Sequence, residues 1–294
     1  MRAEDLYREG AESLKRAGVR EYRIDAFYLM EYAAGITRSH YFAHPGEDIP
    51  EPACSAFRES IRKRSLHIPL QQITGAQEFM GFSFHVGADT LIPRQDTECL
   101  AEKVLSVMHP EDRILDLGTG SGCIIISLLR LAYEKFGRQC SVRGVGTDLS
   151  RGALETAARN RSENGLDETK LELLEGSYFE CVTGRFNIIV SNPPYIRTEE
   201  INSLEDEVKL HEPRLALDGG ADGLDCYRKI TAEAASYLQR GGYLCFEIGC
   251  DQGNDVTHLM RNAGFAGIEV IPDLAGLDRV VIGRKLEETS CLTD

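Results

Sequence analysis

Residues 113–129, RILDLGTGSGCIIISLL, decide the fold, because they change from an apolar strand to an apolar helix across one glycine-rich loop. The run RILDL is short enough for a buried strand, and the apolar run that starts at Cys123 is long enough for a helix. Between them, Gly118, Gly120 and Gly122 let the backbone turn sharply and approach a ligand closely. The stretch predicts a strand, a loop and a helix of an α/β domain. A tight turn without a ligand is the alternative for the loop taken alone.

Strands and helices alternate after this stretch. VRGVGTD, LELLEGS, FNIIV and GYLCFEIG have the pattern of further strands, and helical patterns follow several of them. Such alternation predicts an α/β fold with a mostly parallel sheet and helices on both faces. IEVIP and RVVIGRK are separated only by DLAGLD, which leaves no room for a crossover helix, so they are expected to pair antiparallel. In open sheets of this kind, ligands bind at the carboxyl ends of the strands.

The first 93 residues have a different pattern. From Arg2 to about Ile73, apolar residues recur at spacings near three and four, which predicts a small helical bundle. Glycines and alternating apolar residues then predict a β-hairpin that links two domains. One basic cluster is expected to be a solvated face: Arg58, Arg62, Lys63 and Arg64. The predicted boundaries are 1–73 for the helical domain, 74–93 for the hairpin linker, 94–286 for the α/β domain and 287–294 for a C-terminal tail.

The composition is that of a globular protein. The chain has 294 residues, 42% of them hydrophobic and 27% charged, which suggests roughly two domains. No apolar stretch approaches the roughly 18 residues of a membrane span, and the N-terminus MRAEDLYREG lacks the pattern of a signal or transit peptide. Nine cysteines without a C-x-x-C pair favour reduced thiols over a zinc site or disulfides. We expect a cytoplasmic protein without a metal site.

The charge balance bears on the partner. A formal net charge of −14 argues against broad, non-specific binding of nucleic acid, because such binding depends on Lys and Arg neutralising phosphates. A protein with a basic face remains a plausible partner.

The glycine loop indicates which kind of cofactor is bound. Its spacing is G-x-G-x-G, and Cys123 stands where a dinucleotide fingerprint has its last glycine, so a cofactor without a pyrophosphate is favoured. Asp148 ends the next strand, where a carboxylate suits the two hydroxyls of a ribose; capping the following helix is the alternative. Ser177 and Tyr178 end the third strand, where they can edge and cover an adenine ring. Together these strand ends resemble the Rossmann-like S-adenosylmethionine-dependent methyltransferases, whose sheet also has an antiparallel last strand.

The stretch SNPPYI, residues 191–196, predicts the chemistry. Asn192 and Pro193 each precede a proline, which pushes both toward extended geometry, and the two prolines have fixed φ and no N–H. The stiff segment therefore presents the side-chain oxygen of Asn192 and the carbonyl of Pro193 as acceptors for a planar NH2 group, on which Tyr195 can stack. Alignment of the nitrogen with the methyl donor is expected to supply much of the rate without a strong base. A rigid turn is the alternative.

Longer blocks carry a closer resemblance, which covers nearly the whole chain. Besides DLGTGSG and SNPPYI, the sequence contains PLQQITGAQEFMGFSFHV, TLIPRQDTE and HEPRLALDGGADGLDCYRKI, and in these it resembles the HemK/PrmC family of release factor glutamine methyltransferases. The resemblance implies methyl transfer from S-adenosylmethionine to the N5 amide nitrogen of the Gly-Gly-Gln glutamine in class I peptide-chain release factors. It also implies a helical N-terminal domain that binds the substrate protein. We expect a monomer, without direct nucleic-acid or membrane contact.

The resemblance also assigns residues. It places Asn192, Pro193, Pro194 and Tyr195 at the glutamine side chain, and the cofactor against Gly118, Thr119, Gly120, Ser121, Gly122, Asp148, Tyr178 and Asn192. Three departures stand out. Gln95 replaces a frequent proline, Ser177 stands where many relatives have an acid, and Tyr178 replaces a common tryptophan. Two interpretations of Arg94, Thr97 and Glu98 stay open: they line the cofactor site, or they only begin a helix.

Three other functions are alternatives. The nearest alternative is a nucleic-acid amino methyltransferase of the adenine N6 type, which uses the same N-P-P-Y chemistry but predicts a target-recognition domain and a basic cleft. A nicotinamide oxidoreductase is opposed by the glycine spacing. A binding module that only retains the fold is opposed by the intact N-P-P-Y motif.

Overall fold

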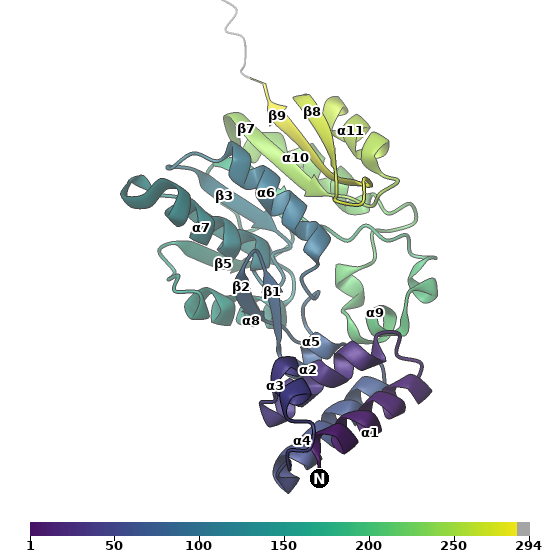
Figure 1. The fold of residues 1–294 in the computed structure, drawn as a ribbon. Helices are drawn as coiled ribbons and strands as arrows, with labels where there is room; N and C mark the ends of the chain where they lie inside the picture. The colour runs from purple at the N-terminus through teal and green to yellow at the C-terminus, as the bar shows by residue number, and fades with distance from the viewer. Residues whose placement is uncertain (287–294) are drawn as a thin grey trace, which may run out of the picture. The chain divides into compact units, whose positions relative to one another are not determined.

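The computed structural model describes residues 1–286, so the predicted tail at 287–294 lies outside the described residues. The chain forms two compact units (Figure 1). The first unit is Met1–Ala76 together with Glu205–His211, and the second is Gln77–Leu204 together with the chain from Glu212 onward. A short segment that follows the N-P-P-Y motif therefore belongs to the N-terminal unit, which the linear sequence did not indicate.

The first unit is a helical bundle, as predicted. Its core consists of apolar side chains such as Leu6, Leu29 and Phe57, none of which is exposed. Helix α1 comes close to α4 because Gly10 has no side chain; a Cβ there would lie 2.5 Å from Cζ of Phe57. The helices are α1 (Ala3–Arg16), α2 (Tyr22–Ala34), α3 (Arg38–Ala43), α4 (Glu51–Ser65), α5 (Leu70–Thr74) and α9 (Asp206–His211).

One basic side chain of this unit is buried, contrary to the prediction of a solvated face. The guanidinium of Arg64 is 5% exposed and donates to Asp25 at 2.7 Å and also to Glu207 of α9. Burial raises the pKa of Asp25, which the hydrogen bond from Arg64 opposes. The prediction was wrong for Arg64 because its two partners lie 39 and 143 residues away in the sequence.

The hairpin predicted near residues 74–93 is present as β1 (Ala76–Phe79) and β2 (Phe82–His85). Its turn uses positive φ angles at Met80 (51°) and Gly81 (80°). Asn160, which is fully buried, holds the end of β2: its Oδ1 accepts from the N–H of His85 at 2.7 Å, and its Nδ2 donates to the carbonyl of His85 at 3.0 Å.

The second unit is built on a seven-stranded sheet in the order β5-β4-β3-β6-β7-β9-β8. The pairs from β5 to β7 are all parallel, and β9 is antiparallel to both of its neighbours, β7 and β8. This confirms the mostly parallel, Rossmann-like sheet with an antiparallel last strand. The strands are β3 (Arg113–Leu117), β4 (Arg143–Asp148), β5 (Leu171–Glu175), β6 (Phe186–Ser191), β7 (Leu238–Glu247), β8 (Phe265–Pro272) and β9 (Asp278–Lys285).

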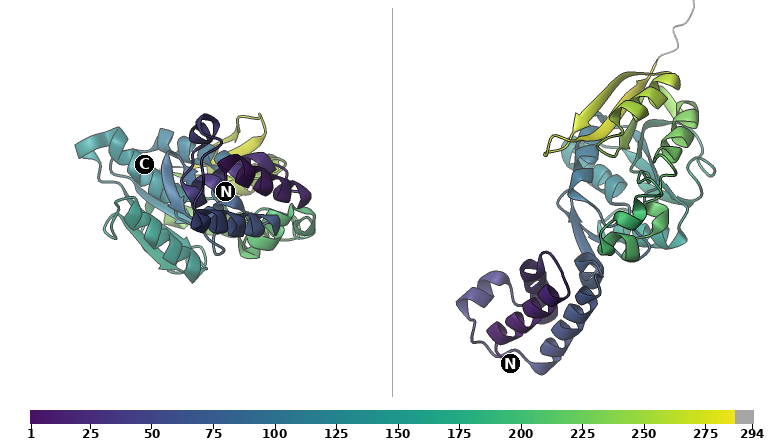
Figure 2. Two further views of the ribbon diagram at one scale, coloured as in Figure 1. Left: turned by 60° about the horizontal axis from the view of Figure 1, so that its bottom comes forward. Right: turned by 90° about the vertical axis from the view of Figure 1, so that its right-hand side faces the viewer.

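Helices cover both faces of the sheet. Figure 1 shows α6 (Glu98–Val107) and α7 (Cys123–Phe136) on one face, with α8 (Arg151–Glu163) beside them. The other face carries α10 (Asp225–Tyr237) and α11 (Gly253–Asn262). Alternate residues of one strand enter the two cores, for example Ile114 on the α7 side and Leu115 on the α10 side, as the period of a strand requires. Figure 2 shows the last two strands, in yellow, side by side at one edge.

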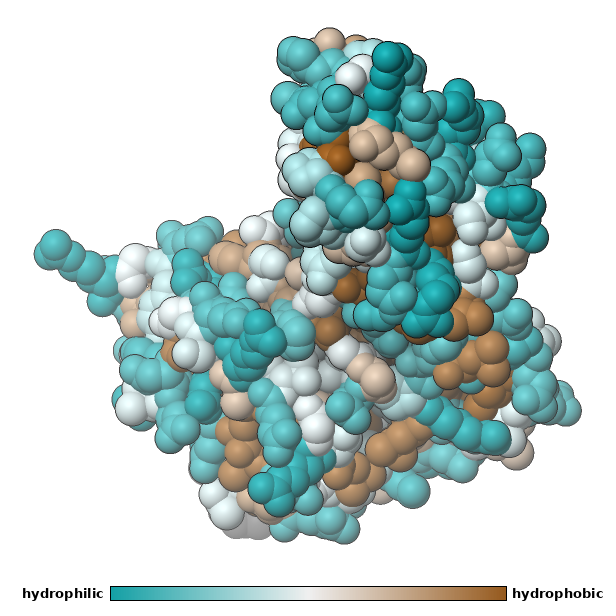
Figure 3. Space-filling model, turned by 90° about the horizontal axis from the view of Figure 1, so that it is seen from below, coloured by the Kyte–Doolittle hydropathy of each residue, from teal (hydrophilic) through white to brown (hydrophobic). Residues whose placement is uncertain are grey.

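The face of the surface that Figure 3 shows is mostly polar. On the face shown in Figure 3, hydrophobic residues form small groups among hydrophilic ones. No helix within residues 1–286 is long and apolar enough to cross a membrane. The eight cysteines of the described chain are all free thiols.

Candidate active site

The glycine loop between β3 and α7 is held against the end of β4. The N–H groups of Gly118 and Thr119 both donate to the carbonyl of Thr147 at 2.9 Å, and the N–H of Gly120 donates to Oδ2 of Asp148 at 2.9 Å. These donors are therefore already used inside the protein, and a carboxylate stands beside them. A pyrophosphate would need free donors and no adjacent negative charge, which argues against a dinucleotide site.

The glycines of this loop have two different purposes. Gly118 (φ 74°) and Gly120 (φ 57°) face open space, since an added Cβ at either would meet no described atom within 4 Å. Gly122 (φ 79°) precedes α7, and a Cβ there would lie 2.8 Å from Cδ1 of Ile126 and 3.3 Å from Cβ of Ala157. Gly122 therefore allows close packing and is not part of the cavity wall.

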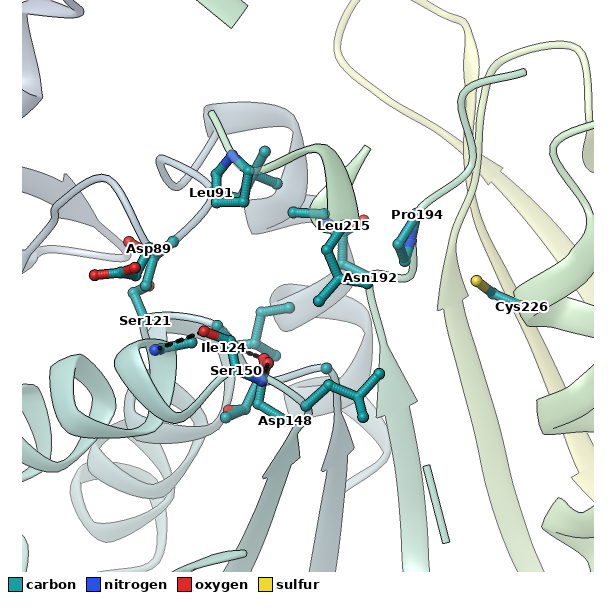
Figure 4. Close-up of a pocket in the computed structure, with 18 of the residues that line it drawn as sticks. Asp89, Leu91, Ser121, Ile124, Asp148, Ser150, Asn192, Pro194, Leu215 and Cys226 are labelled. Carbon is teal, nitrogen blue, oxygen red and sulfur yellow. Dashed lines mark hydrogen bonds between the residues drawn. The ribbon is translucent and has the colours of Figure 1, made fainter. Parts of the chain in front are cut away.

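A cavity of about 470 Å³ opens at the carboxyl ends of β3 to β6 (Figure 4). It brings together most of the predicted cofactor residues, including Thr119, Ser121 and Tyr178. Asn192 and Pro194 also line it, whereas Pro193 and Tyr195 do not. Part of the wall comes from the EPRLALDGG stretch, including Pro213, Leu215 and Asp218, so this stretch borders the cavity.

Asp148 has the free acceptor capacity that a ribose requires. Its Oδ2 accepts from Gly120, and its Oδ1 accepts from the N–H of Ser150 at 2.8 Å. Ser150, and not Asp148, caps α8, because its side chain accepts from the N–H of Ala153 at 3.2 Å. An ionised carboxylate can accept about four hydrogen bonds, so Asp148 retains acceptor sites on the cavity side.

Tyr178 is held in an unusual backbone conformation at the cavity wall. Its φ is 47°, a value that bulky residues rarely adopt. Its carbonyl accepts from the hydroxyl of Thr147 at 3.3 Å. Burial raises the pKa of the Tyr178 phenol, and a hydrogen bond with the Cys226 thiol raises it further. Such strain at a cavity wall is typical of a position fixed for binding.

The N-P-P-Y segment follows β6 at the other side of the cavity. Ser191 ties two strand ends together, because its hydroxyl donates to the carbonyl of Leu117 at 2.7 Å. The Nδ2 of Asn192 donates to Oγ1 of Thr97 at 3.3 Å, which leaves Oδ1 as the acceptor. The Tyr195 hydroxyl is 3.4 Å from Oε1 of Glu247, and burial raises the pKa of this phenol.

The loop that contains Gly219 and Gly223 supports the N-P-P-Y segment from behind. The N–H of Gly219 donates to the carbonyl of Ile196 at 2.8 Å. The buried side chain of Gln252 connects both stretches: its Nε2 donates to the carbonyls of Tyr195 (3.0 Å) and Gly223 (3.2 Å), and its Oε1 accepts from the N–H of Gly249. The rigidity of the motif therefore depends on neighbours as well as on its prolines.

Some residues of the block Arg94–Glu98 line the cofactor site, and others only begin a helix. Arg94 and Thr97 line the cavity, whereas Glu98 begins α6 and accepts from the N–H of Met80 at 2.6 Å. The Arg94 guanidinium forms an ion pair with Glu212, whose side chain is 1% exposed. Thr97 ends a short 3-10 helix (Gln95–Thr97) that directs its side chain toward Asn192.

Sequence reasoning missed three buried polar residues that shape the site: Asn160, Glu247 and Gln252. Asn160 supports the glycine loop by donating to the carbonyl of Ser121 at 2.8 Å. Glu247 had a detectable signal, since it ends a predicted strand at the same edge of the sheet as the other site residues. Asn160 lies within a helix and Gln252 directly before one, where a single sequence gives no such signal.

The residues fit S-adenosylmethionine. Open space faces Gly118 and Gly120, a carboxylate with free acceptor sites stands next to them, and Tyr178 supplies an aromatic wall. Burial, together with the nearby Asp148, raises the pKa of Asp116, below the loop, to about 7, and the hydrogen bond that the Thr119 hydroxyl donates to Asp116 at 2.7 Å opposes this rise. The fold and the site together define a Rossmann-like S-adenosylmethionine-dependent methyltransferase.

Comparison with known proteins supports the assignment to the methyltransferases. Residues 5–75 match the family model of the PrmC N-terminal domain, and residues 95–209 match that of the methyltransferase small domain. A release factor glutamine methyltransferase of Cereibacter sphaeroides is 40% identical over 97% of this chain and 99% of its own length. One of Agrobacterium fabrum is 38% identical over 92% and 93%, respectively. The chain therefore belongs to the release factor glutamine methyltransferase family, as its motifs indicated.

Solved structures agree on the fold. A methyltransferase from Pyrococcus furiosus has a TM-score of 0.51 at 18% identity, over 70% of this chain and 90% of that one. S-adenosylmethionine is the methyl donor that the fold and the family imply.

Proposed function

We propose that this protein transfers a methyl group from S-adenosylmethionine to the side-chain amide nitrogen of the Gly-Gly-Gln glutamine in class I peptide-chain release factors. The product is N5-methylglutamine. One observation carries the proposal: the N-P-P-Y segment borders the cavity with the Oδ1 of Asn192 left as an acceptor, in a chain that matches family members over nearly its whole length.

The mechanism depends on holding a weak nucleophile. The amide nitrogen of glutamine has a delocalised lone pair, so position matters more than proton removal. The Oδ1 of Asn192 and the carbonyl of Pro193 accept the two N–H bonds and stabilise the positive charge that develops on nitrogen. Pro194 stiffens the segment, and Tyr195 supports the carboxamide plane. Bound S-adenosylmethionine would supply an electrophilic methyl group and keep the electron pair of the broken sulfur–carbon bond, and the methylated amide would lose its extra proton to water.

The proposed contacts with the cofactor are based on the residues that line the cavity. Gly118, Thr119, Gly120 and Ser121 form its floor, and Asp148 accepts from the ribose hydroxyls. Tyr178 covers the adenine ring, and Asn192 faces the donor as well as the substrate. Gly122 contributes by letting α7 begin directly behind the loop.

The proposed binding partner is inferred from the helical unit and from the net charge of the protein. The helical unit, predicted as residues 1–73, binds the release factor. The net charge of −14 favours a partner with a basic surface and opposes direct binding of nucleic acid. The protein acts as a monomer in the cytoplasm, where release factors work. The hairpin at 74–93 links this unit to the methyltransferase domain at 94–286.

An acceptor assay with isotope-labelled S-adenosylmethionine tests the proposal. The acceptors are a purified class I release factor, the same factor with its loop glutamine replaced by glutamate, and adenine-containing DNA and RNA. Label is expected in the intact release factor alone. Transfer to DNA or RNA would instead establish the nucleic-acid amino methyltransferase, and equal labelling of both release factors would place the methyl group on another residue.

A further inference from the structure

One buried asparagine of α8 holds two separate stretches of the chain. Asn160 is fully buried, and its Nδ2 donates to the carbonyl of Ser121 at 2.8 Å and to the carbonyl of His85 at 3.0 Å. Its Oδ1 accepts from the N–H of His85 at 2.7 Å. A backbone N–H only donates and a carbonyl only accepts, so these partners fix the orientation of the carboxamide. The glycine loop and the end of β2 are therefore attached to the same side chain.

Both stretches belong to walls of the cavity. Ser121 lines it from the glycine loop, and residues 88–91, which begin three residues after His85, line it as a second wall. Figure 4 shows Asp89, Leu91 and Ser121 among the side chains around the cavity. The second wall also rests on the start of α8, because a Cβ at Gly152 would lie 2.7 Å from Cγ of Asp89. Helix α8 thus supports the second wall near both of its ends.

We infer that Asn160 is a positioning residue for the cofactor, because it sets the spacing between the glycine loop and the wall at residues 88–91. The hairpin is then a support of the cofactor site as well as a linker. The inference rests on the proposed contacts between S-adenosylmethionine and the glycine loop. It does not depend on which molecule accepts the methyl group.

The glycine loop needs support from outside itself. Its three glycines have positive φ angles and permit many backbone conformations, so contacts elsewhere must select one of them. An asparagine inside a helix is less favourable than an alanine, and burying a carboxamide is costly unless it is hydrogen-bonded. The three hydrogen bonds of Asn160 offset this cost. Without the side chain, the Ser121 carbonyl loses this partner, and the loop loses its attachment to α8.

Asn164, one turn later on the same helix, offers a matched control. Its Nδ2 donates to the carbonyl of Ser83 in β2 at 3.2 Å and to the backbone carbonyl of Asn160 at 2.9 Å. It therefore also ties α8 to the hairpin, but within residues 1–286 it has no hydrogen bond to the glycine loop. Replacing either asparagine weakens the attachment of β2, and replacing Asn160 also releases the loop.

Calorimetry and kinetics separate positioning from a merely structural role. In Asn160→Ala the Kd for S-adenosylmethionine should rise by about 10-fold or more, because only molecules with an ordered loop can bind. At saturating cofactor, kcat and the KM for the release factor should change less than about threefold, since the bound cofactor restores the loop. Asn164→Ala should keep the wild-type Kd. An unchanged Kd in Asn160→Ala, or an equal rise in both variants, would overturn the inference.

Hydrogen exchange of the protein without cofactor gives a readout that involves no binding. The N–H groups of Gly118 and Gly120 are hydrogen-bonded inside the protein, so they should exchange slowly in the wild type and in Asn164→Ala. They should exchange faster in Asn160→Ala and in Asn160→Asp. The carboxylate of the latter can still accept from the N–H of His85 but cannot donate to Ser121. Equal rates in all four proteins would overturn the inference.

A measurement on the wild type covers the case in which neither variant of Asn160 folds. A ligand that favours the ordered loop also stabilises, by linkage, the contacts that hold it. Saturating S-adenosylmethionine should therefore slow the exchange of the His85 N–H, and an unchanged rate would overturn the inference. Failure of the proposed function gives a different result: the wild type would bind the cofactor, with Asn160 acting as described, and would leave the release factor unlabelled.

Discussion

Replacing Gly219 with alanine tests whether the loop behind the N-P-P-Y segment sets its geometry. A Cβ at this position would lie 2.8 Å from the carbonyl oxygen of Pro194, 2.8 Å from Cα of Tyr195 and 2.9 Å from the carbonyl oxygen of Gly223. All three are backbone atoms, so no side chain can rotate away. Gly219 does not have a positive φ, so the substitution adds no strain of its own backbone.

The size of the effect follows from these distances. The contacts must lengthen by roughly 0.5 Å or more to reach ordinary van der Waals separation. Overpacking of this kind costs about 1–3 kcal/mol of stability. The displaced atoms include the backbone carbonyl of Pro194, a residue that lines the cavity. A shift of the acceptors by a fraction of an ångström up to about 1 Å should lower kcat by about 10- to 100-fold.

Steady-state methylation of a release factor and urea denaturation measure the two effects. Gly46→Ala is the matched control, because a Cβ at Gly46 meets no described atom within 4 Å and this φ is not positive. The control should keep wild-type activity. Wild-type kcat together with wild-type stability in Gly219→Ala would refute the reasoning, because it would mean that the loop yields without moving the motif.

Three further variants extend the test. Asn192→Ala should bind the cofactor normally in calorimetry but lose methyl transfer by two orders of magnitude or more, and equal loss of both would make Asn192 structural. Asp148→Ala should weaken cofactor binding by about 1–3 kcal/mol, and an unchanged Kd would refute the ribose assignment. Because the folded-state pKa of Glu247 is raised from 4.5 to about 7, the folded protein binds more protons in this range and wild-type stability falls as the pH rises through it. The unfolding free energy of Glu247→Gln relative to wild type, measured by urea denaturation, should therefore increase by about 2–3 kcal/mol as the pH rises from 5 to 8. A free-energy difference that does not change with pH would contradict the raised pKa.

Local signals in the sequence predicted the fold and the floor of the site. The strand, glycine loop and helix at residues 113–129 could be predicted because apolar runs and glycines act over a few residues. Asp148, Tyr178 and Asn192 could then be predicted to lie together, because each lies at the end of a strand or just after it, and parallel strands end at the same edge of the sheet. All three line one cavity.

Long-range pairing explains what the sequence did not predict. Arg64 was expected in solvent, but its partners are Asp25 and Glu207, and the latter belongs to a segment that joins the helical unit from far along the chain. Glu247 and Gln252 support the N-P-P-Y segment from 52 and 57 residues away. Such partners are set by the folded chain; the strand end places Glu247 at the edge of the sheet where the site lies, but no spacing in one sequence reveals which groups it contacts.

Mass spectrometry of a methylated release factor tests the central claim most directly. The factor is incubated with S-adenosylmethionine and either the wild-type protein or Asn192→Ala, and its peptides are sequenced. We expect one added methyl group on the side chain of the Gly-Gly-Gln glutamine with the wild type, and none with the variant even when its cofactor site is saturated. A methyl group on another residue, or the same yield from Asn192→Ala, would contradict the claim that the Asn192 acceptor positions a carboxamide for transfer.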